Sequence, residues 1–285
     1  MLDDRTYLVT GATRGIGRAT AEALARRGSR VILACRDLAA GEDVEETLRR
    51  ATGNPELYVA QLDLSSLDAV RAATADMLDR FDRLDVLINN AGAFTHERRQ
   101  SAEGLELQFA VNHLGHFLLT HGLHDLLVAS APARVVTVSS SAYLRGKLRL
   151  AQVEAGGADP YDPYQAYADS KLANVLFAFE LARRLAGTRV TSNTLHPGTV
   201  ETQMLTDYLK APPVGMPAEF LSVAEGAETT LHVATAPDLD TVTGTYFERS
   251  VPARVGSHAT NLDSARRLWE WSCAMTGAQE SDWAR

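Results

Sequence analysis

Short runs of β-type residues alternate with longer segments of helical period along the whole chain, and this alternation limits the possible folds more than any other feature. Alternating strands and helices are typical of a parallel sheet covered by helices on both faces. The predicted strands are residues 7–10, 30–34, 57–61, 86–89, 134–139, 190–195 and 245–247. The pattern therefore predicts one doubly wound α/β domain of about seven strands over residues 1–285.

The segment after Asp63 carries the clearest helical period. Ser65 and Asp68 have the spacing of a capping box, and apolar residues then recur on one face. These apolar positions are Leu67, Val70, Met77, Leu78 and Phe81. We expect a helix here whose role is packing.

Two long segments, 142–164 and 198–221, show neither the helical period nor the pattern of a β-strand. Loops of this length in compact domains are usually functional or disordered. The second segment combines Pro212, Pro213 and Pro217 with apolar residues that include Met204 and Tyr208. A polar linker would not carry so much apolar surface, so residues 198–221 are predicted to form a lid.

Charge and cysteine content argue against several classes of protein. The net charge of -8 disfavours nucleic acid as a partner, because that binding depends on Lys and Arg neutralising phosphates. Cys35 and Cys273 lie far apart, so neither a disulfide framework nor a zinc site is predicted. The sequence shows no membrane-spanning segment and no leader, so we expect a cytoplasmic protein without an integral membrane anchor. Homodimer, homotetramer and monomer all stay open.

A glycine-rich turn follows the first predicted strand. Residues 10–17 read TGATRGIG and open a helix, so a pyrophosphate can approach backbone N–H groups at the positive end of that helix. This position predicts dinucleotide binding. Arg14 and Arg36 favour NADP(H), whereas Asp37 could bond the free 2'-hydroxyl of NAD(H). We favour NADP(H), and NAD(H) stays possible.

The next two strand ends also carry polar groups suited to a cofactor. Asp63 follows the third strand and could accept a bond from the adenine amino group. The fourth strand ends in residues 89–92, NNAG, whose glycine lets the backbone approach the cofactor. Ligands of open α/β sheets bind at these carboxyl ends, although a plain turn would also use such residues.

Tyr167 and Lys171 are the candidate reactive pair. A spacing of four places the phenol and the ammonium on one face of a predicted helix. A neighbouring cation stabilises phenolate, so Lys171 together with the positive nicotinamide of the oxidised cofactor is expected to lower the pKa of Tyr167 toward the working range. Ser139, Ser140 and Ser141 close the preceding strand and offer a hydroxyl to a substrate carbonyl oxygen. A Tyr and a Lys four residues apart are common on helices, so the spacing alone is weak evidence for a reactive pair. The strand-end serines make this interpretation stronger.

Together these segments resemble the short-chain dehydrogenase/reductase (SDR) family over essentially the whole chain. The matching motifs are TGATRGIG at 10–17, LDLS at 62–65, NNAG at 89–92, the helix containing Asn112, the serine-bearing strand, YADSK at 167–171 and HPGTVET at 196–202. Within the family the chain is most similar to the retinol dehydrogenase and WW-domain oxidoreductase branch. The segments that show this are ACRD at 34–37, VNHLGHFLLT at 111–120 and AYADSKLANVLFAFELARRL at 166–185.

The resemblance implies a Rossmann fold, with a cofactor-binding half at about 1–140 and a catalytic and substrate-binding half at about 140–285. It implies four catalytic residues: Asn112, Ser140, Tyr167 and Lys171. It implies cofactor contacts from Gly11, Thr13, Arg14, Gly15, Ile16, Gly17, Arg36, Asp63, Leu64, Asn90, Ala91, Gly92, Tyr167, Lys171, Pro197, Gly198, Val200 and Thr202. The activity expected is the NADP(H)-dependent interconversion of a hydrophobic ketone or aldehyde and its alcohol.

Other interpretations stay open. The family also includes proteins that bind NADP without turnover, as sensors or scaffolds, and enzymes that catalyse non-redox biosynthetic steps. Four histidines at 113, 116, 121 and 124 lie within helical reach of one another, but no carboxylate or cysteine cluster joins them, so no metal site is predicted. Trp269, Trp271 and Trp283 are expected to complete a core, with a partner surface as the alternative.

Overall fold

A computed structural model describes residues 4–154, 160–209 and 220–283. Its described residues form an eight-stranded sheet in the order β3-β2-β1-β4-β5-β6-β7-β8. The strands are β1 Thr6–Thr10, β2 Arg30–Cys35, β3 Leu57–Gln61, β4 Val86–Asn89, β5 Ala133–Val138, β6 Val190–His196, β7 Tyr246–Glu248 and β8 Val251–Pro252. All neighbouring pairs from β3 to β7 are parallel. The predicted doubly wound α/β fold is confirmed.

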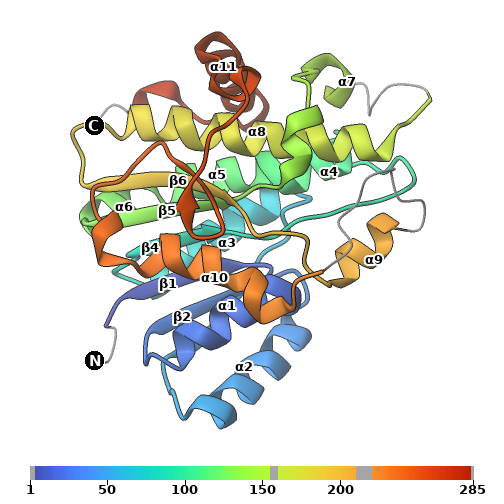
Figure 1. The fold of residues 1–285 in the computed structure, drawn as a ribbon. Coiled ribbons are helices and arrows are strands. Elements are labelled where there is room, and N and C mark those ends of the chain that lie inside the picture. Colours follow the sequence, from blue (N-terminus) through green and yellow to red (C-terminus); the bar gives the residue numbers. More distant parts are fainter. Residues whose placement is uncertain (1–3, 155–159, 210–219, 284–285) are drawn as a thin grey trace.

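Helices cover both faces of the sheet (Figure 1). The helices that pack on one face are α1 Gly15–Ala25, α2 Leu38–Thr52 and α10 Val223–Thr235. On the other face lie α3 Leu67–Arg80, α4 Leu107–Phe109, the π-helix η1 Ala110–Leu114, α5 Gly115–Gly122, α6 His124–Ala129 and α8 Pro163–Arg184. Shorter elements are η2 Ser141–Arg145, α7 Leu150–Glu154, α9 Gln203–Leu209, η3 Pro237–Leu239, η4 Ser257–Thr260 and η5 Glu280–Trp283.

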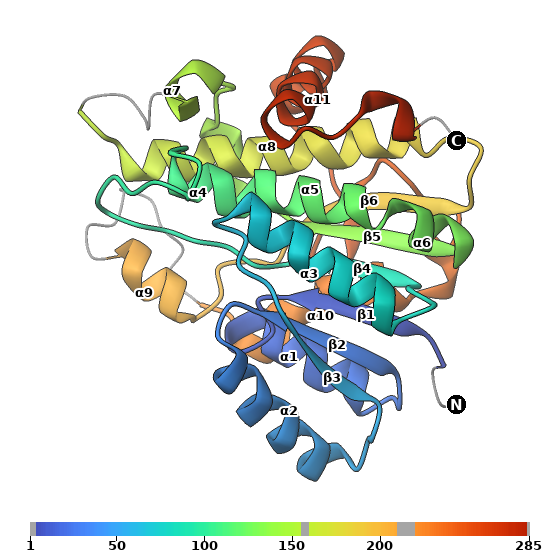
Figure 2. The ribbon, with the colours of Figure 1, turned by 180° about the vertical axis from the view of Figure 1, so that it is seen from behind.

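The last long helix, α11 Leu262–Thr276, lies outside α8 (Figure 2). Its Trp269 is fully buried, with ring centroids 5.0 Å from Phe117 of α5 and 6.0 Å from Phe177 of α8. Trp283 is buried against Trp269 at 4.8 Å. The prediction that tryptophans complete a core is therefore confirmed for Trp269 and Trp283, whereas Trp271 is only half-buried.

The sheet differs from the prediction at its last strand. β8 pairs antiparallel with β7 and is an eighth strand that the sequence pattern did not indicate. The two strands are joined by Arg249 and Ser250, which have positive φ angles of 50° and 61°. Tight hairpin turns of this kind usually carry Asn-Gly or a similar pair, and Arg-Ser is not such a pair, so this turn could not be predicted.

The start of α3 also differs from the prediction. Ser66, not Ser65, caps the helix, and its side chain accepts a hydrogen bond from the N–H of Ala69. The hydroxyl of Ser65 instead donates to Asp63 at 2.6 Å, which removes it from the capping position. Leu78 is 46% exposed, because the buried face of α3 runs through Ala73 and Met77 instead.

The two segments predicted to be irregular are partly helical. Residues 142–164 include most of η2, all of α7 and the first two residues of α8, while residues 155–159 lie outside the described residues. The predicted lid at 198–221 contains α9, while residues 210–219, with Pro212, Pro213 and Pro217, also lie outside.

Strand order fixes where a site can form. β1 lies between β2 and β4, and the chain winds away from β1 in opposite directions toward β3 and toward β8. At such a reversal the connections leave on opposite faces of the sheet, so ligands of open α/β sheets bind outside the carboxyl ends of these central strands. The candidate residues after β1, β4 and β5 all lie at this edge.

Candidate active site

The amino terminus of α1 is free to bind an anion. Its N-cap residue, Arg14, makes no side-chain capping bond, and its first turn carries no acidic residue. By contrast, the long helices α2, α3, α8, α10 and α11 are each capped by an Asp, Ser or Asn side chain. The open N–H groups and the helix dipole of α1 suit a phosphate.

Glycines make the turn before α1 compact. Gly11 and Gly15 have positive φ angles of 69° and 55°. A Cβ on Gly17 would lie 2.3 Å from the carbonyl oxygen of Gly11 and 2.4 Å from Nδ2 of Asn90, so only glycine fits. The end of β1 is joined to the end of β4 by Asn90, whose Nδ2 donates to the carbonyl oxygen of Thr10 at 2.8 Å. The predicted contact residues Ile16, Thr13 and Ala91 lie half-buried around this turn.

The charged residues predicted to contact the adenosine part of the cofactor differ in whether they already have a partner in the protein. Arg14 and Arg36 are exposed, and neither guanidinium has a hydrogen-bond or ion-pair partner among residues 4–154, 160–209 and 220–283. The carboxylate of Asp37 instead caps α2 by accepting from Ala40 N–H at 3.2 Å. Asp63 is half-buried and uses one oxygen to accept from Ser65, and the neighbouring Leu64 is buried.

The long helix α8 holds the reactive pair. Pro163 at its first position and the Asp162 cap, which accepts from Tyr164 and Gln165 N–H groups, start the helix one turn before Tyr167. Tyr167 and Lys171 are both buried, and Nζ of Lys171 lies 5.6 Å from the centre of the Tyr167 ring. The ammonium also donates to the carbonyl oxygen of Val138 at the end of β5, at 3.1 Å. The spacing of four thus places the two groups side by side.

Burial controls the ionisation of this pair. It lowers the pKa of Lys171 to about 8. Burial also raises the pKa of Tyr167, the interaction with Ser140 lowers it, and the nearby Tyr208 raises it. The expectation that Lys171 brings the pKa of Tyr167 down is therefore not met in the protein alone, because loss of hydration outweighs the other effects on the phenol.

The three serines after β5 differ in their surroundings. Ser139 is buried and donates to the carbonyl oxygen of Lys171 at 2.8 Å, so it holds α8 against the sheet. Ser141 is exposed. Ser140 is half-buried, caps η2 and interacts with the Tyr167 hydroxyl. Of the three, Ser140 is the one placed to share a ligand atom with Tyr167.

Asn112 lies in the π-helix η1 and is fully buried. Its amide accepts from the N–H of Ala93 at 2.6 Å and donates to the hydroxyl of Ser170 at 2.9 Å. That hydroxyl in turn donates to the carbonyl oxygen of Tyr167 at 2.7 Å. π-Helical turns inside longer helices are frequent at functional sites. Asn112 therefore connects the segment after β4 with the helix that carries Tyr167.

The segment after β6 returns to the phosphate-binding turn. A Cβ built on Gly15 would lie 3.5 Å from Cγ2 of Thr202, which places the two residues side by side. Gly198 has a positive φ of 90°, Pro197 is half-buried and Val200 is buried. On the other side of the site, a Cβ on Gly92 would lie 3.1 Å from Met204 and 3.8 Å from Nζ of Lys171. The structure thus brings together predicted residues that are far apart in the sequence.

An aromatic cluster surrounds the Tyr167 hydroxyl, and the sequence interpretation missed part of it. The ring of Phe94 lies 5.8 Å from that of Tyr167 and 5.0 Å from that of Tyr208 on α9. Tyr164, one turn before Tyr167, lies 4.8 Å from Tyr208 and donates to its carbonyl oxygen. Tyr208 lies in the predicted lid, but nothing in the spacing of Phe94 or Tyr164 reveals that α9 packs on them.

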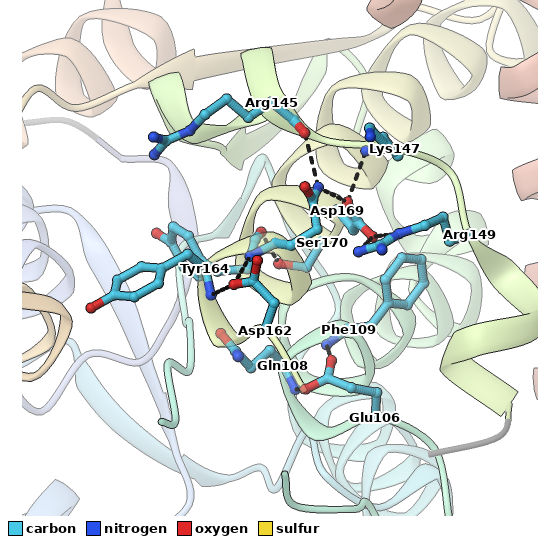
Figure 3. A network of polar contacts seen from close by, with 12 residues as sticks. Glu106, Gln108, Phe109, Arg145, Lys147, Arg149, Asp162, Tyr164, Asp169 and Ser170 are labelled. Atoms are coloured by element: carbon cyan, nitrogen blue, oxygen red, sulfur yellow. Dashed lines mark hydrogen bonds and ion pairs between the residues drawn. The ribbon is translucent and has the colours of Figure 1, made fainter. Parts of the chain in front are cut away.

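A polar network anchors the start of α8 from its other side (Figure 3). The carboxylate of Asp169 accepts from the N–H of Lys147 at 2.8 Å and pairs with Arg149 at 2.7 Å. Glu106 accepts from Phe109 N–H at 2.7 Å and from the Tyr161 hydroxyl at 2.8 Å. Burial raises the pKa of both carboxyl groups. This network ties the segment between Ser140 and Tyr167 to α8.

Among the residues that the structure describes, no group of three or more His, Cys, Asp or Glu side chains is arranged to hold a metal ion. None of the described helices combines the length and apolar character needed to cross a bilayer. His113, His116 and His124 are buried, and His113 bonds to the hydroxyl of Ser272 at 2.9 Å.

Comparison with known proteins identifies the family. Residues 5–212 match the model of the short chain dehydrogenase family. The chain belongs to this family, whose members bind NAD(H) or NADP(H).

Within it, the chain is similar to the retinol dehydrogenases. It is 42% identical to retinol dehydrogenase 14 of Homo sapiens, over 97% of this chain and 88% of that protein. It is 43% identical to retinol dehydrogenase 12 of Mus musculus, over 96% and 87%. The fold also matches the crystal structure of an uncharacterized protein from Mycobacterium Paratuberculosis, with a TM-score of 0.79, 35% identity and coverage of 96% and 94% of the two chains. The resemblance to the retinol dehydrogenase branch is confirmed.

Proposed function

We propose that this oxidoreductase interconverts a hydrophobic ketone or aldehyde and its alcohol, using NADP(H). The observation that carries the proposal is the convergence of Ser140, Tyr167 and Lys171 at the same edge of the sheet as the uncapped amino terminus of α1. The bound dinucleotide would supply a hydride to the carbonyl carbon, or accept one from the alcohol. We propose that the half of the chain up to about residue 140 holds it and the remainder shapes the substrate pocket.

The proton that balances the hydride comes from Tyr167. Because burial raises its pKa, the phenol is protonated at neutral pH and can donate to the carbonyl oxygen during reduction. Ser140 would polarise that oxygen by donating a hydrogen bond to it. Lys171 would hold the nicotinamide ribose and stabilise the phenolate left behind, and Asn112 would hold a water that connects Lys171 to solvent. In the oxidation direction the same groups act in reverse.

Two observations support NADP(H) over NAD(H). The exposed guanidinium groups of Arg14 and Arg36 have no partner in the described structure, so both are available to a 2'-phosphate. The competing acid, Asp37, is engaged as the cap of α2. A direct test compares NADPH and NADH binding to wild type and Arg36→Ala, with the exposed Arg18→Ala on α1 as control. Equal binding of both cofactors to the wild type would show that Arg36 does not select.

The hydrophobic character of the substrate is inferred from the aromatic cluster. Phe94 and Tyr208 pack on the ring of Tyr167, and Tyr164 packs on both of them. The sulfur of Met204 lies 3.8 Å from the Tyr167 hydroxyl, so a bound carbonyl would be flanked by apolar surface. The cysteine content is the basis on which we propose a reducing, cytoplasmic environment, since Cys35 and Cys273 form no disulfide.

The central experiment is a screen of apolar ketones and aldehydes with purified protein, measuring alcohol formed per NADPH consumed. Tyr167→Phe is expected to keep NADPH binding but to lower turnover by about 10²- to 10⁴-fold, the usual contribution of a general acid. Tyr58→Phe is the matched control, because it removes a hydroxyl on β3 whose bond goes to Glu56. Wild-type turnover in Tyr167→Phe would overturn the assignment, and NADPH binding without turnover of any substrate would favour a sensor or a non-redox enzyme.

A further inference from the structure

His116 is a buried histidine with both ring nitrogens engaged, and the proposed chemistry does not use it. It is 1% exposed and lies in the first turn of α5, directly after the π-helix that holds Asn112. Its Nε2 lies 2.8 Å from the hydroxyl of Thr10, and its Nδ1 lies 3.0 Å from the carbonyl oxygen of Asn112. The ring thus joins the end of β1 to the helix containing the catalytic amide.

The partners fix the proton on this ring. A carbonyl oxygen can only accept, so Nδ1 carries the hydrogen and donates to Asn112. Nε2 is then the acceptor and receives the hydroxyl hydrogen of Thr10. Burial, with a smaller repulsion from Lys171, lowers the pKa of His116 to about 4, so the ring is neutral near pH 7.

The Thr10 hydroxyl is itself a junction. It accepts from the N–H groups of Asn90 and Ala91, each at 2.9 Å, at the end of β4. These residues pack directly against the phosphate-binding turn, because a Cβ on Gly11 would lie 2.9 Å from Cα of Ala91. Two N–H donors leave the Thr10 hydroxyl with one hydrogen to give. Nε2 of His116, at 2.8 Å, is a much closer acceptor for it than the carbonyl oxygen of Ile88, at 3.4 Å. His116 therefore fixes the rotation of the hydroxyl on which the Asn90–Ala91 turn rests.

At the other end, His116 acts on Asn112. The helix carries a π-turn here, in which Gly115 N–H bonds to the carbonyl oxygen of Ala110. The ring donates to the backbone carbonyl of Asn112, and so it fixes the peptide from which the amide reaches Ala93 and Ser170.

We propose that His116 is a positioning residue that couples the dinucleotide-binding turns to the catalytic helix by holding Thr10 and Asn112 at a fixed separation. This inference rests on the proposed function. The ring does not touch substrate in this arrangement, since it is fully buried and both nitrogens are already bonded to the protein.

A matched control is available two-thirds of a turn earlier on the same continuous helical segment. His113 is also 1% exposed, and burial lowers its pKa to about 3, but its hydrogen bond goes to Ser272 on α11. His113→Phe and His116→Phe therefore make the same chemical change in equally buried positions. Only His116→Phe removes a bond to the proposed cofactor turn.

The experiment measures NADPH affinity, turnover and thermal stability for both variants, and for each combined with Thr10→Val. We expect His116→Phe to weaken NADPH binding by roughly tenfold, the size of one buried hydrogen bond, and His113→Phe to leave it within about twofold. The effects of His116→Phe and Thr10→Val on affinity should add up to less than their sum, because the bond between Thr10 and His116 is lost in either variant, whereas those of His113→Phe and Thr10→Val should add. His116→Gln, whose amide oxygen can reach Thr10, should restore part of the affinity.

Hydrogen exchange adds a readout that needs no ligand. Loss of His116 should speed exchange of the peptide containing Asn90 and Ala91 N–H groups, and loss of His113 should not. Wild-type affinity and exchange in His116→Phe, or equal losses in the two histidine variants, would overturn this inference alone. NADPH binding without turnover by the wild type would overturn only the proposed activity, and a wild type that binds neither NADPH nor NADH would overturn both.

Discussion

The sulfur of Met204 lies 3.8 Å from the hydroxyl oxygen of Tyr167. Tyr167 would donate its proton in that direction, so the thioether occupies space that a substrate oxygen must enter. Met204 lies on α9, which is also held by the bond from the Tyr164 hydroxyl to Tyr208 and by His96, which contacts the carbonyl oxygen of Asp207. In this conformation α9 covers the reactive phenol.

Shortening Met204 should therefore favour substrate binding. We expect Met204→Ala to lower the KM of a bulky apolar ketone several-fold while kcat changes by less than about twofold, because the substrate no longer displaces the side chain. Steady-state kinetics with one bulky and one small ketone would measure this. Leu205→Ala removes similar apolar volume from the same helix, and an equal effect in that control would argue against a specific role for Met204.

The surroundings of the three serines lead to a second prediction. Ser140→Ala should reduce kcat by about 10²-fold, because it removes a donor to the developing oxyanion. Ser139→Ala should instead lower the free energy of unfolding by about 1 kcal/mol through its lost bond to Lys171. Ser141→Ala, at an exposed position, is the control for both. Kinetics and urea unfolding of the three variants would distinguish them, and a larger kinetic loss in Ser139→Ala than in Ser140→Ala would reverse the assignment.

The lowered pKa of Lys171 predicts a pH dependence of cofactor capture. With a pKa of about 8 in the free protein, the ammonium loses its proton as the pH rises through that value. We therefore expect kcat/KM for NADPH, which reports groups of the free enzyme, to fall above about pH 8. Lys171→Arg should be less active but should lack this decline, because guanidinium stays charged. Exposed Lys147→Arg should keep the wild-type profile, and a flat wild-type profile through pH 9 would contradict the prediction.

Acid stability should depend on His113 and His116, which are both buried. The folded-state pKa values of about 3 for His113 and about 4 for His116 lie below the ordinary 6.5, so the unfolded chain binds more protons as the pH falls below 6.5. Stability is lost in that direction until the folded pKa is reached, by about 2 kcal/mol per histidine between pH 7 and 5.

His113→Phe removes the contribution of one histidine, so the variant should lose less stability than the wild type between pH 7 and 5. Urea unfolding at both pH values would measure the difference between wild type and variant. That difference is the quantity to compare, because the raised pKa values of Glu106 and Asp169 act in the opposite direction in both proteins. An identical pH dependence in the two proteins would show that His113 takes up its proton normally.

The fold could be predicted because its parallel strands are buried on both faces and appear as short apolar runs, such as residues 86–88 in β4. β8 could not, since Val251–Pro252 is too short to show a period and its turn uses two residues that seldom adopt positive φ. The cap of α3 was misplaced by one residue because adjacent serines are equivalent in sequence, and only the bond from Ser65 to Asp63 separates them.

Those parts of the candidate site whose residues are close together in the sequence could be predicted. Tyr167 and Lys171 are one helical turn apart, so their proximity follows from spacing alone. The direction of the Tyr167 pKa shift did not follow, because it depends on burial under residues from other elements, such as Tyr208. Phe94 and Tyr164 were missed for the same reason, since their partner on α9 is brought to them by the tertiary fold.

The packing of α11 on α8 has a consequence for how the protein is made. A chain leaves the ribosome from its first residue onward, so the strands and turns proposed to bind the dinucleotide emerge long before Trp269 and Trp283. Until these two indoles arrive, Phe117 and Phe177 lack the cover that they have in the finished molecule. The packing around the helix that carries Tyr167 and Lys171 is therefore among the last to be completed in a nascent chain.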